Sequence, residues 1–180
     1  MTVFFDKYQK YKDYHWGWYE KKSSYTKHVN RVKDWIKEKN VLDIGAGDGL
    51  ITSMVGMKGI DNSLAAVDLA QRKGADVIYG DAHYLPFEDE KFDSAFMGDT
   101  LEHLEDPIRA LREARRVIKY YFYVTGPLAG DGLEKYEYQK WTVEELKEKV
   151  ESVGFKLEGE LEILERKNRP GIFYAKFKKI

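Results

Sequence analysis

The stretch from Val41 to Gly49 has the residue types of a ligand-binding turn. It reads Val-Leu-Asp-Ile-Gly-Ala-Gly-Asp-Gly, so a short apolar run passes through an acid into a glycine-rich turn. Glycines are typical of a turn where a ligand comes close to bare backbone, or where φ must be positive. The pattern predicts a nucleotide-type cleft, with a glycine-rich turn that binds nothing as the alternative.

Glycine spacing and two acids narrow the chemistry of that ligand. A dinucleotide fingerprint, G-x-G-x-x-G, would need glycine at position 50, where this sequence has Leu50. Asp43 and Asp48 would repel an anionic pyrophosphate but attract a ligand that carries sulfonium and ammonium groups. S-adenosylmethionine is such a ligand, and a NAD-linked oxidoreductase is the weaker alternative.

Length and composition predict one globular domain of a cytoplasmic protein. The chain has 180 residues, of which 43% are hydrophobic and 34% charged, and neither a membrane span nor a signal peptide is indicated. It has no cysteine, which excludes disulfides and thiolate chemistry, and its richness in Lys and Glu is typical of a thermophile. A formal net charge of −1 disfavours nucleic acid as a partner.

Apolar periodicity predicts alternating helices and strands around the turn. Strands are expected at 40–44, up to 61, 75–79, 92–97, 120–124, 155–163 and 172–177. Helices are expected from Ser23 onward, at 50–55, from 64, from 107 and at 142–150. We therefore predict a single-domain α/β fold of Rossmann-like type. Its seven-stranded sheet should be mostly parallel, with an antiparallel C-terminal hairpin and helices on both faces.

With these motifs in order, the sequence resembles the class I S-adenosylmethionine-dependent methyltransferases, specifically the small-molecule type 11 group. The resemblance covers roughly residues 40–163. It rests on the glycine turn, on Gly59-Ile60-Asp61-Asn62, on Gly80-Asp81-Ala82, and on the run from Asp99 to Pro107. Two features depart from the group: the connection from Gly49 to Asp61 is short, and the usual Pro-Gly-Gly turn is absent.

The resemblance implies a cofactor site for S-adenosylmethionine. Asp61 would hold the ribose hydroxyls, since a carboxylate accepts two hydrogen bonds from a diol, and the Asp81 turn would receive the adenine amine. The full predicted set is Asp43, Gly45, Ala46, Gly47, Gly49, Asp61, Asn62, Asp81, Ala82 and Asp99. The product would be S-adenosylhomocysteine.

Two residues near the end of the predicted fourth strand are the predicted catalytic groups. Methyl transfer is an in-line displacement that mainly needs positioning, but a hydroxyl or protonated amine acceptor also needs a base. His103 is the leading choice and Asp99 the second. A structural hydrogen-bonding role for His103 and a capping or solvated role for Asp99 are the alternatives. No metal site is expected.

Aromatic residues near the N-terminus and in a long loop are the predicted substrate contacts. Segment 1–22 either packs on the domain 23–180 or folds over the cofactor as a lid. The predicted contacts are Tyr14, His15, Trp16, Trp18, Tyr136 and Tyr138.

We predict a methyltransferase that acts on a small molecule, as a monomer or homodimer. A tRNA or protein methyltransferase and a non-catalytic S-adenosylmethionine-binding module are the alternatives.

Overall fold

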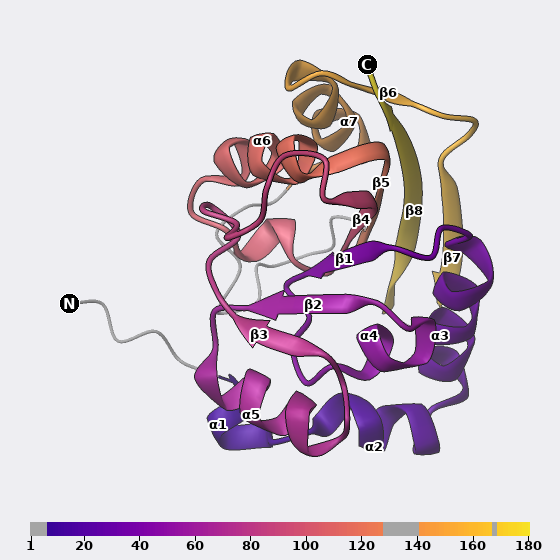
Figure 1. Ribbon diagram of the computed structural model, residues 1–180. Coiled ribbons are helices and arrows are strands. Elements are labelled where there is room, and N and C mark those ends of the chain that lie inside the picture. Colours follow the sequence, from indigo (N-terminus) through magenta and orange to yellow (C-terminus); the bar gives the residue numbers. More distant parts are fainter. Residues whose placement is uncertain (1–6, 128–140, 167–168) are drawn as a thin grey trace. The chain divides into compact units, whose positions relative to one another are not determined.

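A computed structural model describes residues 7–127, 141–166 and 169–180 (Figure 1). The chain divides into two compact units, residues 1–81 and 82–180. Each unit is described by itself.

The first unit alternates helices with three short parallel strands. Its elements are α1 (Lys7–Tyr11), α2 (Tyr14–Lys21), α3 (Ser23–Trp35), β1 (Val41–Ile44), α4 (Leu50–Val55), β2 (Lys58–Asp61), α5 (Leu64–Arg72) and β3 (Val77–Tyr79). The central strand β2 pairs in parallel with β1 on one side and β3 on the other. All four residues of β1 are buried. The carboxyl ends of β1 and β2 therefore meet at one edge of this sheet, where open α/β sheets bind ligands.

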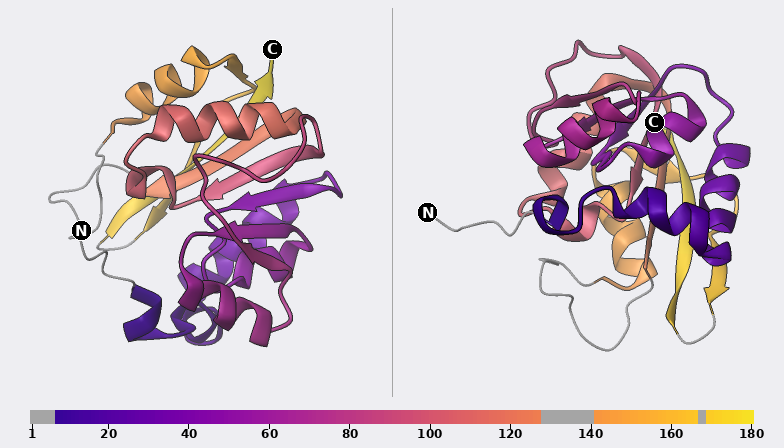
Figure 2. Two further views of the ribbon diagram at one scale, coloured as in Figure 1. Left: turned by 60° about the vertical axis from the view of Figure 1, so that its left-hand side comes forward. Right: turned by 90° about the horizontal axis from the view of Figure 1, so that it is seen from below.

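Local sequence explains where the helices of this unit begin and end. Ser63 caps α5, because its hydroxyl accepts a hydrogen bond from the Ala66 backbone N–H at 3.0 Å. Gly74 follows α5 with φ +80°, a conformation that suits glycine after a helix. The helix α1 packs against α5, and both Figure 1 and the left view of Figure 2 show α1 and α5 side by side.

The second unit combines one parallel strand pair with an antiparallel C-terminal set. Its elements are β4 (Phe92–Gly98), the 3₁₀ turn η1 (Leu101–His103), α6 (Pro107–Val117), β5 (Ile118–Pro127), α7 (Val143–Ser152), β6 (Phe155–Leu157), β7 (Glu162–Arg166) and β8 (Arg169–Lys179). Here β4 pairs in parallel with β5, while β8 is antiparallel to β5, β6 and β7. The helix α6 packs on β5 and against α7, and the left view of Figure 2 shows α6 lying across the strands.

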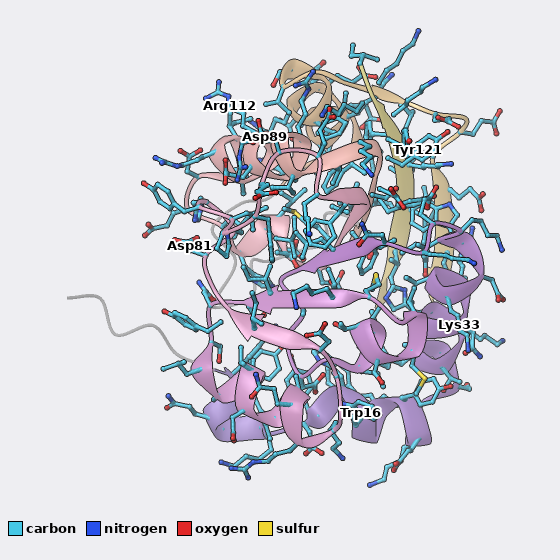
Figure 3. All side chains as sticks on the ribbon, in the orientation of Figure 1. Trp16, Lys33, Asp81, Asp89, Arg112 and Tyr121 are labelled. Carbon is cyan, nitrogen blue, oxygen red and sulfur yellow. The ribbon has the colours of Figure 1, made fainter. Side chains whose placement is uncertain are left out.

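Capping residues explain where the helices of this unit begin. Asp106 caps α6 and Pro107 is its first residue, and Thr142 with Glu145 forms a reciprocal capping box on α7. Figure 3 labels Asp89, in the loop before β4, and Arg112, on α6. Asp89 accepts a hydrogen bond from Arg116 at 2.8 Å, which holds the loop before β4 against α6.

The α/β class and the antiparallel C-terminal hairpin are confirmed, but the strand count was wrong. The described residues contain eight strands, because the predicted strand 155–163 is two strands, β6 and β7. Gly159, with φ +79°, lies in the break between them. Both strands still pair with β8. The alternating pattern therefore predicted strand conformation correctly, but one continuous strand was wrong. Within the described residues, none of the helices has the length and apolar character needed to cross a membrane.

Candidate functional site

The glycine-rich turn joins β1 to α4 at the carboxyl edge of the first unit. Its glycines, Gly45, Gly47 and Gly49, have φ values of +82°, +55° and +75°. These angles explain the residue type, since other side chains are strained there. The backbone N–H groups of Gly45 and Ala46 donate to the Ile60 carbonyl at 2.8 and 3.1 Å, so the turn is tied to β2.

Asp61, the last residue of β2, is bound directly to this turn. Its Oδ2 accepts a hydrogen bond from the Gly47 N–H at 2.8 Å, and its Oδ1 accepts one from the Ser63 N–H, also at 2.8 Å. Because a carboxylate oxygen accepts two hydrogen bonds, a carboxylate held in this way is a suitable acceptor for a vicinal diol. The structure thus brings together the turn and the acid that the sequence predicted to cooperate.

Asp43 lies in β1, beneath the turn. Its carboxyl is 2% exposed and accepts a hydrogen bond from the Thr52 hydroxyl at 2.6 Å. The pKa of Asp43 is raised to about 7, chiefly by burial and also by the nearby charge of Asp61, although the Thr52 hydrogen bond lowers it. At neutral pH this carboxyl is therefore only partly ionised. Asp43 therefore carries less negative charge than a fully ionised aspartate would, and its role in a cofactor site stays a prediction.

Asp48, between Gly47 and Gly49, is bound by α2. Its carboxylate accepts hydrogen bonds from the His15 backbone N–H at 3.0 Å and pairs with the His15 ring Nδ1 at 3.1 Å. The Trp16 indole N–H donates to the Asp48 carbonyl at 2.9 Å, and Figure 3 labels Trp16 on α2. Asp48 is 1% exposed as a result. The helix α2 is therefore attached to the glycine-rich turn through both the side chain and the backbone of Asp48.

Tyr8, on α1, covers Gly47. A methyl group added at Gly47 would overlap the Tyr8 hydroxyl, and the ring carbon Cζ would lie 3.0 Å from it. Burial raises the pKa of Tyr8 well above its usual value, and Tyr14, Asp61 and Asp48 raise it further. The phenol is therefore a neutral hydroxyl against the turn. Packing of segment 1–22 on the rest of the chain was one of the two predictions for it, but no sequence signal indicated that Tyr8 covers Gly47.

The predicted aromatic contacts of α2 lie together with Tyr8. Tyr14 stacks on Tyr8 with ring centroids 5.6 Å apart, and the Trp18 ring meets Tyr14 edge-on at 4.8 Å. The ammonium of Lys22 lies 3.8 Å from the centroid of Trp18. Tyr8 is buried, while Tyr14, Trp18 and Lys22 are partly buried. The predicted contacts Tyr136 and Tyr138 lie outside the described residues.

An ion pair adds another anchor for this segment. Asp13, just before α2, pairs with Lys73 at 2.8 Å, and the Lys73 ammonium lies 5.3 Å from the Trp16 ring centroid. Both members of the ion pair are more than a third exposed, so it contributes little to stability. Docking of α1 and α2 therefore depends on Tyr8 and Asp48 more than on this pair.

Other predicted site residues lie at the ends of β3 and β4. Asn62 and Asp81 are exposed in the first unit, and Figure 3 shows Asp81 beyond the end of β3. In the second unit Asp99 is exposed, with φ +48°, and its N–H donates to the Thr125 carbonyl at 3.0 Å. His103 is partly buried at the end of η1. Ala82 begins the second unit and is partly buried. The roles of these residues remain predictions.

The described ranges contain no cluster of three or more His, Asp or Glu side chains placed to hold a metal ion.

Comparison with known proteins finds a similarity to methyltransferases. A family model described as a methyltransferase domain matches residues 42–121, from β1 to β5. Over these residues the chain is similar to methyltransferase domains. An uncharacterized protein of Methanocaldococcus jannaschii is 34% identical over 121 residues, 66% of this chain and 57% of that protein. A demethylmenaquinone methyltransferase of Thermotoga maritima is 36% identical over 106 residues, 52% of this chain and 46% of that enzyme.

A solved structure shows the same fold over nearly the whole chain. It is an S-adenosylmethionine-dependent enzyme of Thermotoga maritima, described as a possible histamine N-methyltransferase, with a TM-score of 0.80. The match covers 96% of this chain and 98% of that one at 22% identity, which supports the fold alone. The chain spans about half the length of the curated relatives it matches. The resemblance inferred from the glycine turn is confirmed.

Proposed function

We propose that this protein binds S-adenosylmethionine at the glycine-rich turn of the first unit and transfers its methyl group to a small-molecule acceptor. The observation that carries the proposal is the hydrogen bond from the Gly47 N–H to Asp61. It joins a turn of positive-φ glycines to a carboxylate at the neighbouring ends of two parallel strands. Similarity to a methyltransferase domain over residues 42–121 supports the cofactor class.

The residues of this edge suit the chemistry of that cofactor. Asp61 would accept hydrogen bonds from the ribose hydroxyls, with its carboxylate oriented by Gly47 and Ser63. Gly45 has no side chain, and the methionine portion would lie against its backbone, next to the part of the turn that Tyr8 covers. When bound, the cofactor supplies an activated methyl group on a sulfonium. The protein then has to orient an acceptor and exclude water.

The N-terminal segment 1–22 is proposed to cover the cofactor turn. Support comes from Tyr8 against Gly47 and from the hydrogen bonds of His15 and Trp16 to Asp48. Tyr14 and Trp18 form an aromatic surface beside them, which suits a flat or cationic acceptor. A relative that methylates demethylmenaquinone makes an aromatic acceptor reasonable. The near-neutral net charge favours a small molecule over a nucleic acid.

Ligand binding tests the cofactor assignment. Calorimetry with S-adenosylhomocysteine, NADH and ATP in parallel should give binding for S-adenosylhomocysteine alone. Asp61→Ala should weaken it by about 1–3 kcal/mol, because a charged hydrogen-bond partner is lost. Asp68→Ala is the matched control, since Asp68 is exposed and pairs with Arg72 within α5. Binding of NADH alone, or equal affinity in the Asp61→Ala variant, would contradict the proposal.

Labelling tests the acceptor class. The protein is incubated with methyl-labelled S-adenosylmethionine and a cell extract of its organism, and the extract is then fractionated. Label in the small-molecule fraction is expected. Label in the RNA or protein fraction would show that the acceptor class is wrong while leaving the cofactor assignment intact.

A further inference from the structure

His15 and Asp48 form a pair with the geometry of a histidine base and its orienting carboxylate. The carboxylate of Asp48 contacts His15 twice: Oδ2 accepts from the backbone N–H at 3.0 Å, and Oδ1 lies 3.1 Å from the ring Nδ1. Asp48 is almost completely buried, while the His15 side chain is 20% exposed. The carboxylate is thus committed to the histidine, and the histidine still reaches solvent.

This contact determines which ring nitrogen can act as a base. A carboxylate only accepts hydrogen bonds, so Nδ1 of His15 must carry the hydrogen. In the neutral imidazole the other nitrogen, Nε2, then has the lone pair. Nε2 has no hydrogen-bond partner among the residues that the structure describes.

Neighbouring rings hold the imidazole in its orientation. The Tyr14 ring centroid lies 4.0 Å from that of His15, and Tyr25 stacks on His15 at 5.7 Å with an interplanar angle of 11°. Trp18 meets His15 edge-on at 5.5 Å. A ring packed on several sides and bound at Nδ1 keeps Nε2 pointing in one direction, as a catalytic base requires.

The pair is built on the turn that is proposed to hold the methyl donor. Asp48 lies between Gly47 and Gly49, so His15 is attached to that turn by its side chain and its backbone. We propose that His15, in place of the His103 expected from the sequence, is the general base of the methyl transfer and that Asp48 is its positioning residue. This inference rests on the proposed function.

The step conserves atoms and charge. The O–H or N–H proton of the acceptor moves to Nε2 of His15 while the acceptor oxygen or nitrogen forms a bond to the methyl carbon. The carbon–sulfur bond breaks, and its electron pair stays on sulfur. The products are the methylated acceptor, a neutral thioether and an imidazolium that is stabilised by the Asp48 carboxylate.

A substitution can separate the base from the attachment of α2. In His15→Asn, the amide nitrogen occupies a position close to that of Nδ1 and can still donate to Asp48, but Nε2 is gone. The matched control is Glu20→Gln, an exposed residue near the end of the same helix. Three measurements are made: S-adenosylhomocysteine affinity by calorimetry, kcat and KM with the extract fraction that the wild-type protein labels, and the tautomer of His15 by ¹⁵N NMR.

We expect His15→Asn to lower kcat about 100-fold or more, the usual effect of losing a general base, with S-adenosylhomocysteine affinity within threefold of wild type. Glu20→Gln should retain kcat within twofold. The NMR spectrum should show His15 with hydrogen on Nδ1, and Asp48→Asn should shift part of the population to the Nε2–H form.

Other results would overturn the role of His15. These are a wild-type His15 with hydrogen on Nε2, an unchanged kcat in His15→Asn, or a loss of S-adenosylhomocysteine affinity in parallel with kcat, which would make His15 a structural contact. Failure of the proposed function has a different signature. The wild-type protein would then bind no S-adenosylhomocysteine or label no fraction, and the assignment of His15 as a base would be wrong for that reason.

Discussion

Replacing Gly47 with alanine, with and without the Tyr8 hydroxyl, tests the contact between the N-terminal segment and the glycine-rich turn. Gly47 has φ +55°, and an added methyl group would overlap the Tyr8 hydroxyl. In Tyr8→Phe that oxygen is absent, and the nearest ring carbon would lie 3.0 Å from the new methyl group. A small movement of the ring then accommodates it.

The expected energies differ between the two backgrounds. The left-handed conformation costs alanine about 1–2 kcal/mol in either background. Displacing the buried hydroxyl adds about 1–3 kcal/mol of overpacking, but only while Tyr8 is present. Gly47→Ala should therefore lower the free energy of unfolding by about 2–5 kcal/mol in the wild-type protein and by about 1–2 kcal/mol in Tyr8→Phe.

Urea unfolding of the full chain measures the four proteins of this cycle. The coupling between the two positions should be about 1–3 kcal/mol, with Tyr8→Phe partly rescuing Gly47→Ala. Gly56→Ala is a suitable control for backbone strain, because Gly56 has φ +81° and no atom would lie within 4 Å of the added methyl group. Costs at positions 8 and 47 that simply add, within about 0.5 kcal/mol, would refute the contact.

Three further changes test the buried polar groups and the segment above them. Asp43 has a folded pKa of about 7, above its unfolded value of about 3.9, so its contribution to stability falls as pH rises from 4 through 7. Between pH 4 and 7 the unfolding free energy of the wild-type protein, relative to that of Asp43→Asn, should fall by up to about 1.4 kcal/mol per pH unit. Urea unfolding at several pH values measures this, and the same pH dependence in both proteins would contradict it. Thr52→Val removes the hydroxyl that donates to Asp43 and should lower the free energy of unfolding by about 1–3 kcal/mol at pH 8. The loss should be smaller at pH 5, because a protonated carboxyl needs that donor less. An equal loss at both pH values would show that the hydroxyl does not stabilise the ionised carboxylate. Deletion of residues 1–20 should leave part of the S-adenosylhomocysteine affinity while abolishing turnover, as calorimetry and methyl transfer can show, and unchanged turnover would refute the covering role.

Local pattern was sufficient for the elements and for the parts of the site that lie close in sequence. The apolar run before Gly45, the acid that closes β2 and the cap Ser63 each have a signal within a few residues. Such signals depend on backbone conformation and on hydrogen bonds between residues close in sequence, so they can be recognised without knowledge of the fold. The break between β6 and β7 was missed because alternation of apolar and polar residues continues across it.

The sequence by itself was enough to predict the methyltransferase resemblance, the cofactor class, and the turn and acid proposed to bind the cofactor, because glycine conformation and carboxylate chemistry are properties of the residues themselves. Tertiary structure decided the contacts of Tyr8 with Gly47 and of His15 with Asp48, which is 33 positions away. It also decided that Asp43 is only partly ionised at neutral pH. Contacts between distant segments and the exclusion of water arise from packing, and neither leaves a periodic signal in the chain.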